Sequence, residues 1–259
     1  MIITTAGRVT SQLVAKAKKL SHEYNIPFKE RHGVSIAQLK SLYQDDIMIV
    51  GKDRIDISPY QSDKNLFFHP NLAMIRAKRI LKGEVEPLIT TAKLTSGKSF
   101  LDCTLGLASD SIIASLAVGP DGRVVGIEGN EILYLLAKQG LGSLATGILE
   151  FDQAMRNIEV VHLDHLKFLQ RAESNSFDIV YFDPMFHEGI NESNGINIIR
   201  EQAITTDITT EIVREAKRVA KERVVLKDHW KSNRFNELGF IQFKRKTSLF
   251  HYGTIEIQK

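Results

Sequence analysis

The sequence predicts a doubly wound, mostly parallel α/β sheet, preceded by a small α/β unit. From residue 99 onward, short apolar runs alternate with amphipathic segments such as 130–140 and 207–221. Continuous apolar strands that alternate with helices are typical of a parallel sheet covered on both faces. The strand-like runs are SFLDCTL, VVGIEG, IEVVHLD, DIVYFDP and RVVLKD. The last two runs, FIQFKRK and HYGTIEI, lie too close together for a crossover helix, so we expect an antiparallel pair there.

The first 62 residues predict a small basic α/β unit. MIITT reads as a strand, and apolar side chains recur at helical spacing over 11–24. Ser35 can cap a second helix, IAQLKSLY, and IMIVGKDRIDI reads as two strands around Gly51. The polar stretch SPYQSDKN marks a boundary, which gives domains at 1–62 and 63–259 with 63–98 as a helical lead-in.

Composition narrows the class of protein. The chain has 259 residues, of which 43% are hydrophobic and 25% are charged, as in ordinary globular proteins. It has no apolar run near the roughly 18 residues of a membrane helix and no secretory leader pattern, so we expect a cytoplasmic protein without membrane contact. The single cysteine, Cys103, excludes an internal disulfide and a cysteine-cluster metal site, and we expect no metal. The oligomeric state stays open.

Basic residues are concentrated in the front part of the chain. Residues 1–98 hold 16 Lys and Arg against 9 Asp and Glu, whereas residues 99–259 hold 18 against 22. This asymmetry indicates contact with a polyanion, and the run Arg76-Ala77-Lys78-Arg79 is a candidate for it. An unevenly charged solvated surface explains the same pattern equally well.

Polar residues end every strand-like run of the predicted parallel sheet. Ligands of such sheets bind beyond the carboxyl ends of the strands. The residues at these ends are Asp102, Glu128, Asp164, Asp183 and Lys227. The sequence therefore predicts a ligand site lined by carboxylates.

The turn after the first of these strands reads Asp102-Cys-Thr-Leu-Gly106-Leu-Ala-Ser-Asp110. Small residues let the backbone approach a ligand closely, and the helix that follows points its N-terminus at it. The dinucleotide pattern G-x-G-x-x-G fails here at two of three glycines. Asp102 would crowd a pyrophosphate but would suit an amino group or a sulfonium, which favours S-adenosylmethionine over NAD. Asp110 is either a ligand contact or a helix cap.

The next two strand ends fit the rest of such a cofactor. Glu128 follows Gly106 by 22 residues, and a carboxylate there can accept two hydrogen bonds from a ribose diol. Asp164 could accept from an adenine amino group, or simply cap the next helix. A structural surface acid is the alternative for Glu128.

The stretch VYFDPMF predicts the reacting end of the site. Asp183 and the carbonyl of Pro184 offer two rigid acceptors, and Phe186 lies close by in sequence. This arrangement suits a planar base with an exocyclic amine, whose lone pair two acceptors can turn toward a methyl donor. A plain Asp-Pro turn is the alternative. Cys103 lies in the first turn and reads as a small buried residue rather than a nucleophile.

Taken together, FLDCTLGLASDS, VVGIEGN, VYFDPMF, RVVLKD and HYGT resemble the bacterial small-subunit ribosomal RNA guanine-N2 methyltransferases. The resemblance covers about residues 66–259. It implies a seven-stranded, Rossmann-like methyltransferase sheet, S-adenosylmethionine as cofactor and RNA as partner. The chain departs from the family's pattern at Ala108, where a glycine is usual, and in the acidic segment HEGINESNGIN.

Motif position in that family implies cofactor contacts at Ser109, Asp110, Glu128, Gly129, Asp164, His165 and Asp183. With the first turn, the predicted cofactor site also includes Asp102, Thr104, Gly106 and Ala108. The predicted catalytic residues are Asp183, Pro184 and Phe186. Two other hypotheses remain: a methyltransferase of a small molecule or a protein side chain, and a catalytically silent RNA-binding or assembly factor that retains the cofactor pocket.

Overall fold

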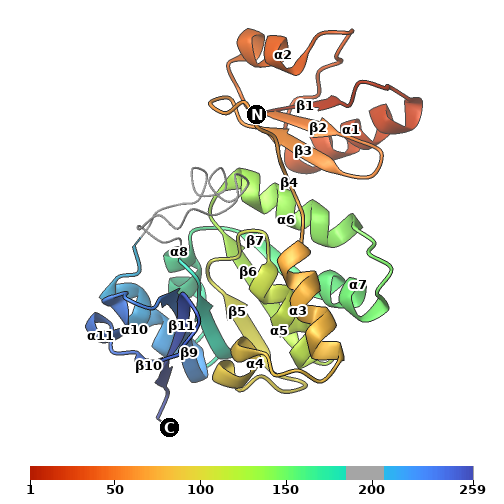
Figure 1. Cartoon of the computed structure of the whole chain (residues 1–259). Helices are drawn as coiled ribbons and strands as arrows, with labels where there is room; N and C mark the ends of the chain where they lie inside the picture. Colours follow the sequence, from red (N-terminus) through yellow and green to blue (C-terminus); the bar gives the residue numbers. More distant parts are fainter. Residues whose placement is uncertain (185–206, 259) are drawn as a thin grey trace. The chain divides into compact units, whose positions relative to one another are not determined.

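A computed structural model describes residues 1–184 and 207–258 (Figure 1). The chain divides into two compact units. The first contains Met1–His69 and Leu135–Leu144, and the second contains Pro70–Tyr134 together with the described residues from Ala145 onward. In the described ranges, every helix is too short or too polar to cross a membrane.

The first unit is built on a four-stranded sheet in the order β1-β2-β3-β4. The strands are β1 (Ile2–Thr5), β2 (Ile47–Val50), β3 (Ile55–Ser58) and β4 (Leu66–Phe67). β1 pairs parallel with β2, and the other pairs are antiparallel. Because β4 pairs with β3 at Asp56↔Phe67, the small sheet extends past the boundary predicted at residue 62.

Two capped helices complete this unit. α1 (Ser11–Tyr24) begins after Thr10, whose hydroxyl accepts from the Leu13 N–H. α2 (Ile36–Tyr43) begins with the predicted Ser35 cap, and Gln38 returns a hydrogen bond to form a capping box. Capping of this kind satisfies N–H groups that the first helical turn leaves unpaired. Local sequence therefore fixes where both helices start.

The second unit contains a seven-stranded sheet in the order β10-β11-β9-β8-β5-β6-β7. Its strands are β5 (Ser99–Asp102), β6 (Arg123–Glu128), β7 (Ile158–His162), β8 (Phe177–Phe182), β9 (Ala220–His229), β10 (Ile241–Phe243) and β11 (Phe250–Glu256). The first five pair in parallel, and β11 runs antiparallel to both β9 and β10. The predicted mixed sheet and its closing antiparallel pair are confirmed.

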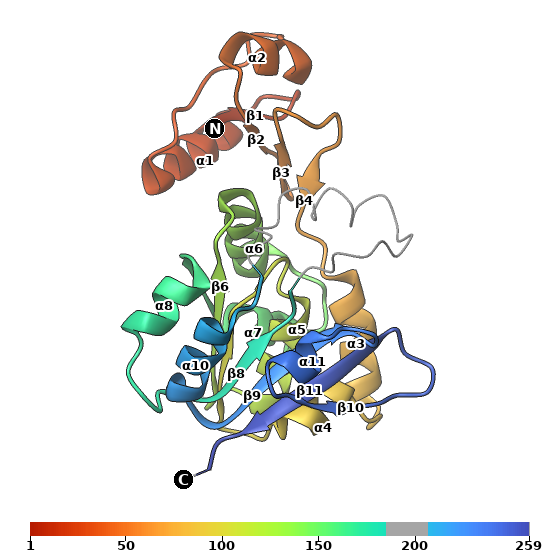
Figure 2. The ribbon, with the colours of Figure 1, turned by 90° about the vertical axis from the view of Figure 1, so that its left-hand side faces the viewer.

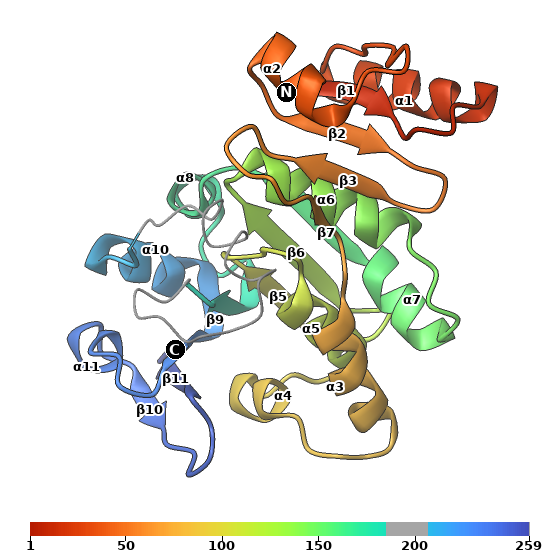
Figure 3. The same ribbon diagram turned by 45° about the horizontal axis from the view of Figure 1, so that its top comes forward.

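Helices cover both faces of this sheet, as Figures 2 and 3 show. α4, α5 and α7 lie on one face, with α3 packed on α5, and α8 and α10 lie on the other. The helices of this unit are α3 (Asn71–Leu81), α4 (Pro87–Ala92), α5 (Ser109–Val118), α7 (Leu149–Arg156), α8 (His165–Arg171), α10 (Thr210–Val219) and α11 (Arg234–Glu237). A further helix, α6 (Glu131–Ser143), lies mostly in the first unit, which contains Leu135–Leu144. The apolar side of α10, including Ile212 and Ala216, is fully buried against Val180 and Leu226 of the strands.

The strand order reverses at β5, which lies between β8 and β6. β5 leads through α5 to β6 on one side, whereas β8 lies on its other side. Such a switch point opens a crevice beyond the carboxyl ends of the strands. Asp102, Glu128 and Asp183 all stand at or just past these ends, as the sequence predicted.

Candidate active site

The turn between β5 and α5 is anchored by its own backbone and by the next strand. The Leu105 N–H donates to the Ile127 carbonyl at 3.1 Å. Gly126 of β6 makes room for Leu105, since a Cβ there would lie 2.3 Å from a Leu105 methyl. Gly106 adopts φ +53° with open space where a Cβ would stand. The turn therefore presents bare backbone next to the crevice.

Ala108 carries the same left-handed backbone at φ 63° and forms the N-cap position of α5 without a side-chain hydrogen bond. L-residues with a Cβ are disfavoured in this region, and glycine normally occupies it. The resemblance drawn from sequence placed a glycine here, and the structure gives the reason. Alanine keeps the required backbone, with its methyl group fully buried.

Glu128 connects this turn to the end of β6. One carboxylate oxygen accepts from the Gly106 N–H and the other from the Asn130 N–H, each at 2.9 Å. Burial raises the pKa of Glu128 above its ordinary value, and these backbone hydrogen bonds oppose the rise. The Gly129 backbone also opposes this rise. A carboxylate has about four acceptor sites, so Glu128 keeps capacity to accept from a hydroxyl group.

The end of β7 supports the Glu128 turn. The Leu163 N–H donates to the Glu128 carbonyl, and the His162 ring lies 3.2 Å from the Gly129 carbonyl and stacks on Tyr134. Asp164 caps α8 by accepting from the Lys167 N–H, which is the structural alternative raised for it. A contact between Asp164 or Gly129 and the cofactor stays a prediction.

His165 has a buried polar atom that nothing satisfies. Its ring packs against Phe182 in a T-shaped arrangement, with the two ring centres 6.2 Å apart. Its Nε2 has no hydrogen-bond partner among the residues the structure describes. Burial lowers the pKa of His165, although Asp164 opposes this. A buried ring nitrogen at the carboxyl edge of the sheet is free to bond a ligand.

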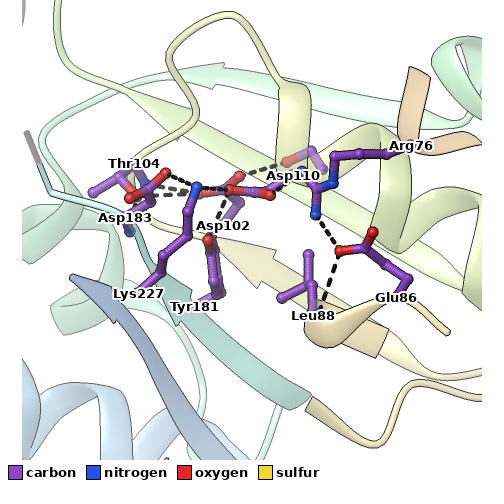
Figure 4. A network of polar contacts seen from close by, with 10 residues as sticks. Arg76, Glu86, Leu88, Asp102, Thr104, Asp110, Tyr181, Asp183 and Lys227 are labelled. Atoms are coloured by element: carbon purple, nitrogen blue, oxygen red, sulfur yellow. Dashed lines mark hydrogen bonds and ion pairs between the residues drawn. The ribbon is translucent and has the colours of Figure 1, made fainter. Parts of the chain in front are cut away.

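A network of charges lies beneath the turn (Figure 4). Asp110 accepts from Arg76 at 2.5 Å through Oδ1, and from Lys227 at 2.9 Å and the Tyr181 hydroxyl at 2.8 Å through Oδ2. Lys227 also donates to Asp183 Oδ2 at 2.6 Å. Lys227 thus bridges two carboxylates that come from different elements, α5 and the end of β8.

Opposing effects set the protonation states of this network. Burial alone would raise the pKa of Asp110, but Lys227 and Arg76 outweigh it and hold that pKa well below its ordinary value. Burial alone would lower the pKa of Lys227, but Asp110 and Asp183 outweigh it and raise that pKa. Burial, reinforced by Asp110, raises the pKa of Asp183 to about 6 although Lys227 opposes the rise.

Asp102 has an internal role. Its Oδ2 accepts from the Ser111 hydroxyl at 2.6 Å, and its Oδ1 accepts from the Thr104 N–H at 3.0 Å. Thr104 in turn accepts from the Asp183 N–H at 2.6 Å, which links β5 to the end of β8. Burial raises the pKa of Asp102 to about 7. As cofactor ligands, Asp102, Thr104 and Ser109 stay predictions.

Two interpretations from sequence need correction. Arg76 was a candidate for contact with a polyanion, but it pairs with Asp110 and with Glu86 at 2.7 Å and is only 21% exposed. Asp110 does not cap α5, because its carboxylate is fully engaged with side chains instead. The catalytic prediction for Phe186 falls outside the described residues, whereas Asp183 and Pro184 lie within them.

Sequence reasoning missed the partners in the network. The sequence showed Lys227 as a polar residue at the end of a strand, but it did not show that Lys227 pairs with Asp110 and Asp183. Tyr181, Ser111 and Glu86 gave no signal at all, since each meets its partner through the tertiary fold. Among the described residues, no group of three or more His, Cys, Asp and Glu side chains is placed to hold a metal ion.

Comparison with known proteins defines the class. The family model described as "Putative SAM-dependent methyltransferase" matches residues 38–248. The chain belongs to this family of S-adenosylmethionine-dependent methyltransferases, and S-adenosylmethionine is its cofactor. It is 48% identical over 255 residues to the Bacillus subtilis protein YpiP, described as uncharacterised, covering 98% of this chain and 99% of that one. A crystal structure of a SAM-dependent methyltransferase from Neisseria gonorrhoeae has the same fold, with a TM-score of 0.65 and 15% sequence identity. The match covers 99% of this chain and 96% of that one.

The residues present fit this cofactor. Glu128 keeps lone pairs for a ribose diol, Gly106 leaves its backbone bare, and His165 Nε2 is buried without a partner among the described residues. The network places four carboxyl groups, those of Glu86, Asp102, Asp110 and Asp183, near two cations, Arg76 and Lys227. The excess of acidic groups suits a sulfonium cation.

Glu128→Ala is expected to weaken binding of S-adenosylmethionine by about 1–3 kcal/mol, the range for a hydrogen-bonding charged group. The expected loss comes from the ribose contacts and from the freed Gly106 N–H. Isothermal calorimetry with S-adenosylhomocysteine measures it. Glu131→Ala, a change at an acid in the first turn of α6, is the control. Equal affinities of wild type and Glu128→Ala would remove Glu128 from the cofactor site.

Proposed function

We propose that this methyltransferase transfers a methyl group to the exocyclic N2 amine of a guanine in small-subunit ribosomal RNA. The observation that carries the proposal is the placement of Asp183. It follows β8 directly, and its N–H donates to Thr104 in the turn that leads from β5 to α5. Its Oδ2 is held by Lys227, whereas its Oδ1 has no donor in the described part of the chain.

Asp183 Oδ1 and the Pro184 carbonyl are then two acceptors for one amine. An exocyclic amine is a poor nucleophile because its lone pair is delocalised into the ring. Two acceptors that take its N–H bonds turn the lone pair out of the ring plane, and orientation of this kind lowers the barrier. Lys227 and the Thr104 hydroxyl fix Asp183 in place beforehand, so little reorganisation is needed during the reaction.

When bound, S-adenosylmethionine supplies an electrophilic methyl group on its sulfonium. The chain's own groups hold the amine and stabilise the positive charge that develops on nitrogen. The methylated nitrogen is acidic while it is cationic, so its proton can pass to Asp183, whose pKa is about 6, and then to water. No stronger base is required.

The carboxylate surroundings bear on the alternative substrates. A protein carboxylate as methyl acceptor would meet the Asp183 carboxylate, and like charges at close range disfavour binding. A neutral base with an amine has no such penalty. The D-P-M-F stretch and its resemblance to guanine-N2 enzymes favour guanine, with Phe186 proposed to stack on the base. The test is mass-spectrometric mapping of ribosomal RNA nucleotides in cells with and without the gene. An unchanged N2-methylguanosine pattern would overturn the proposal.

The rate of methyl transfer is expected to depend on the ionisation of Asp183. Its pKa is raised to about 6, so at pH 5 the carboxyl is mostly protonated and its acceptor role is lost. The single-turnover rate should therefore rise between pH 5 and 7, with a midpoint near 6, and level off above. An Asp at its ordinary pKa near 3.9 would give a flat profile over this range.

Asp183→Asn is the matched control for this profile, because an amide does not titrate. This variant should react more slowly, and its rate should no longer show a midpoint near pH 6. A midpoint that persists in Asp183→Asn would assign the titration to another group, such as Asp102, whose pKa burial raises to about 7.

A further inference from the structure

The turn that joins β10 and β11, residues 244–249, stands at the same edge of the sheet as the active site. β11 pairs with β9 in the register Phe250↔His229 and Tyr252↔Lys227. The Lys227 ammonium lies 5.7 Å from the centre of the Phe250 ring. The turn therefore leads into β11 next to Lys227, the residue that holds Asp183; Figure 2 shows the connection between β10 and β11.

This edge carries basic side chains without acidic partners. From 230 to 251 the chain holds five Lys and Arg residues and a single acid, although 99–259 as a whole is acidic. Arg234 is used internally, in pairs with Asp207 and Asp228. The other four are exposed, and none forms an ion pair among the described residues. They are Lys231, Lys244, Arg245 and Lys246.

Aromatic side chains are interleaved with these cations. Trp230 is 45% exposed and Phe243 is 47% exposed, which is unusual for side chains of this size. Lys231 lies over the Trp230 ring at 5.0 Å. Trp230, the turn and His251 line an open groove of about 540 Å³.

The groove is held in shape by the interior of the unit. The buried His251 ring bonds the Arg245 N–H through Nε2 at 3.0 Å, and its Nδ1 lies 2.9 Å from Gln242 Nε2. Gln242 also donates to the Trp230 carbonyl, and the Trp230 N–H donates to the Leu249 carbonyl. The aromatic face and the basic turn are thus fixed relative to each other.

We propose that this surface, Trp230 and Lys231 with the 244–249 turn, binds the single-stranded RNA that flanks the target nucleotide. The inference rests on the proposed function. Unpaired cations beside exposed aromatic faces are the combination that binds single strands, the cations meeting phosphates and the rings stacking on bases. An acidic peptide would use the cations but would leave the aromatic faces without a partner.

Trp230 reports on this contact directly, because it is the sole tryptophan of the chain. Titration of the full-length protein with a single-stranded oligoribonucleotide of about 12 nucleotides, within the usual site size, should quench its fluorescence. Polyglutamate of equal charge should not. Equal quenching by polyglutamate would overturn the proposal in favour of an acidic protein partner.

Variants test the two components separately by anisotropy of the labelled oligoribonucleotide. Lys244→Ala combined with Lys246→Ala should lower the slope of log affinity against log salt by roughly 1.4, since each lost contact to a single strand contributes about 0.7. Trp230→Ala should weaken binding roughly 5- to 100-fold, and Trp230→Phe much less, because a ring remains to stack.

Lys217→Ala combined with Lys221→Ala is the matched control. Both lysines are exposed: Lys217 lies in the last turn of α10, and Lys221 lies at the amino end of β9, where it pairs with Asp178 on the side of the sheet opposite the catalytic edge. The control should keep the salt slope, and all variants should keep their affinity for S-adenosylhomocysteine. RNA binding by the wild type with an unchanged slope in Lys244→Ala/Lys246→Ala would overturn this inference alone. Failure of the wild type to bind RNA would instead overturn the proposal that RNA is the substrate.

Discussion

Asp183→Ala is expected to lower the single-turnover rate of methyl transfer by roughly 10²–10³, the effect of removing one preorganised electrostatic contact. Asp183 Oδ1 acts most strongly when the amine nitrogen gains positive charge, so the loss falls on the transition state. Affinity for RNA and for S-adenosylhomocysteine should change far less. The measurement is transfer of labelled methyl to ribosomal RNA from cells that lack the gene.

The network explains why this variant should still fold. Lys227 loses Asp183 but keeps Asp110 at 2.9 Å, so no buried charge is left alone. Asp178→Ala is the matched control, since Asp178 lies near the amino end of the same strand and pairs with Ser99 and Lys221. It should keep the wild-type rate.

Asp183→Asn refines the result. The amide oxygen can still accept a hydrogen bond, but the negative charge is gone, so the rate should lie between wild type and Asp183→Ala. Methylation by Asp183→Ala at the wild-type rate would mean that Asp183 only ends the strand and forms the turn.

Arg76→Met should lower the free energy of unfolding by about 3 kcal/mol. Removing one member of a buried ion pair typically costs about 3–5 kcal/mol, because the partner charge stays buried and unpaired. The lower end applies here, since Arg76 is 21% exposed and Asp110 keeps Lys227. Glu86, which also caps α4, loses its partner as well. Urea denaturation followed by circular dichroism measures the change.

Arg79→Met is the control on the same helix. Arg79 pairs with Glu84 on the surface, where solvent screens the charges. Its denaturation midpoint should stay at the wild-type value. If Arg76→Met and Arg79→Met unfold at the same urea concentration, the Arg76 pairs contribute nothing to stability.

Local patterns account for the parts of the fold that were predicted from sequence. The buried strands of the parallel sheet are continuous apolar runs. The start of α2 is visible in the four residues from Ser35 to Gln38, which form a capping box. The short β4 was missed because two residues, Leu66 and Phe67, carry no periodicity. The boundary predicted at residue 62 therefore falls before the last strand of the small sheet.

The site was predictable to the extent that strand ends are visible in sequence. Asp102, Glu128 and Asp183 could be placed at the crevice because each closes an apolar run. Their partners could not, since Arg76 and Asp110 are 34 residues apart and Asp110 and Lys227 are 117 apart. A basic residue reads the same in sequence whether it meets solvent, phosphate or a buried carboxylate, which is why Arg76 was assigned to the surface.

The left-handed Ala108 has a consequence for the energetics of turnover. A glycine at this position would sample many backbone conformations in the unfolded chain and around the native turn. Alanine restricts that sampling at the expense of some backbone strain. The conformational entropy of the turn is then lost once, when the chain folds, rather than each time a cofactor molecule arrives. We therefore expect the turn between β5 and α5 to be more rigid before a ligand binds than the same turn with glycine at position 108.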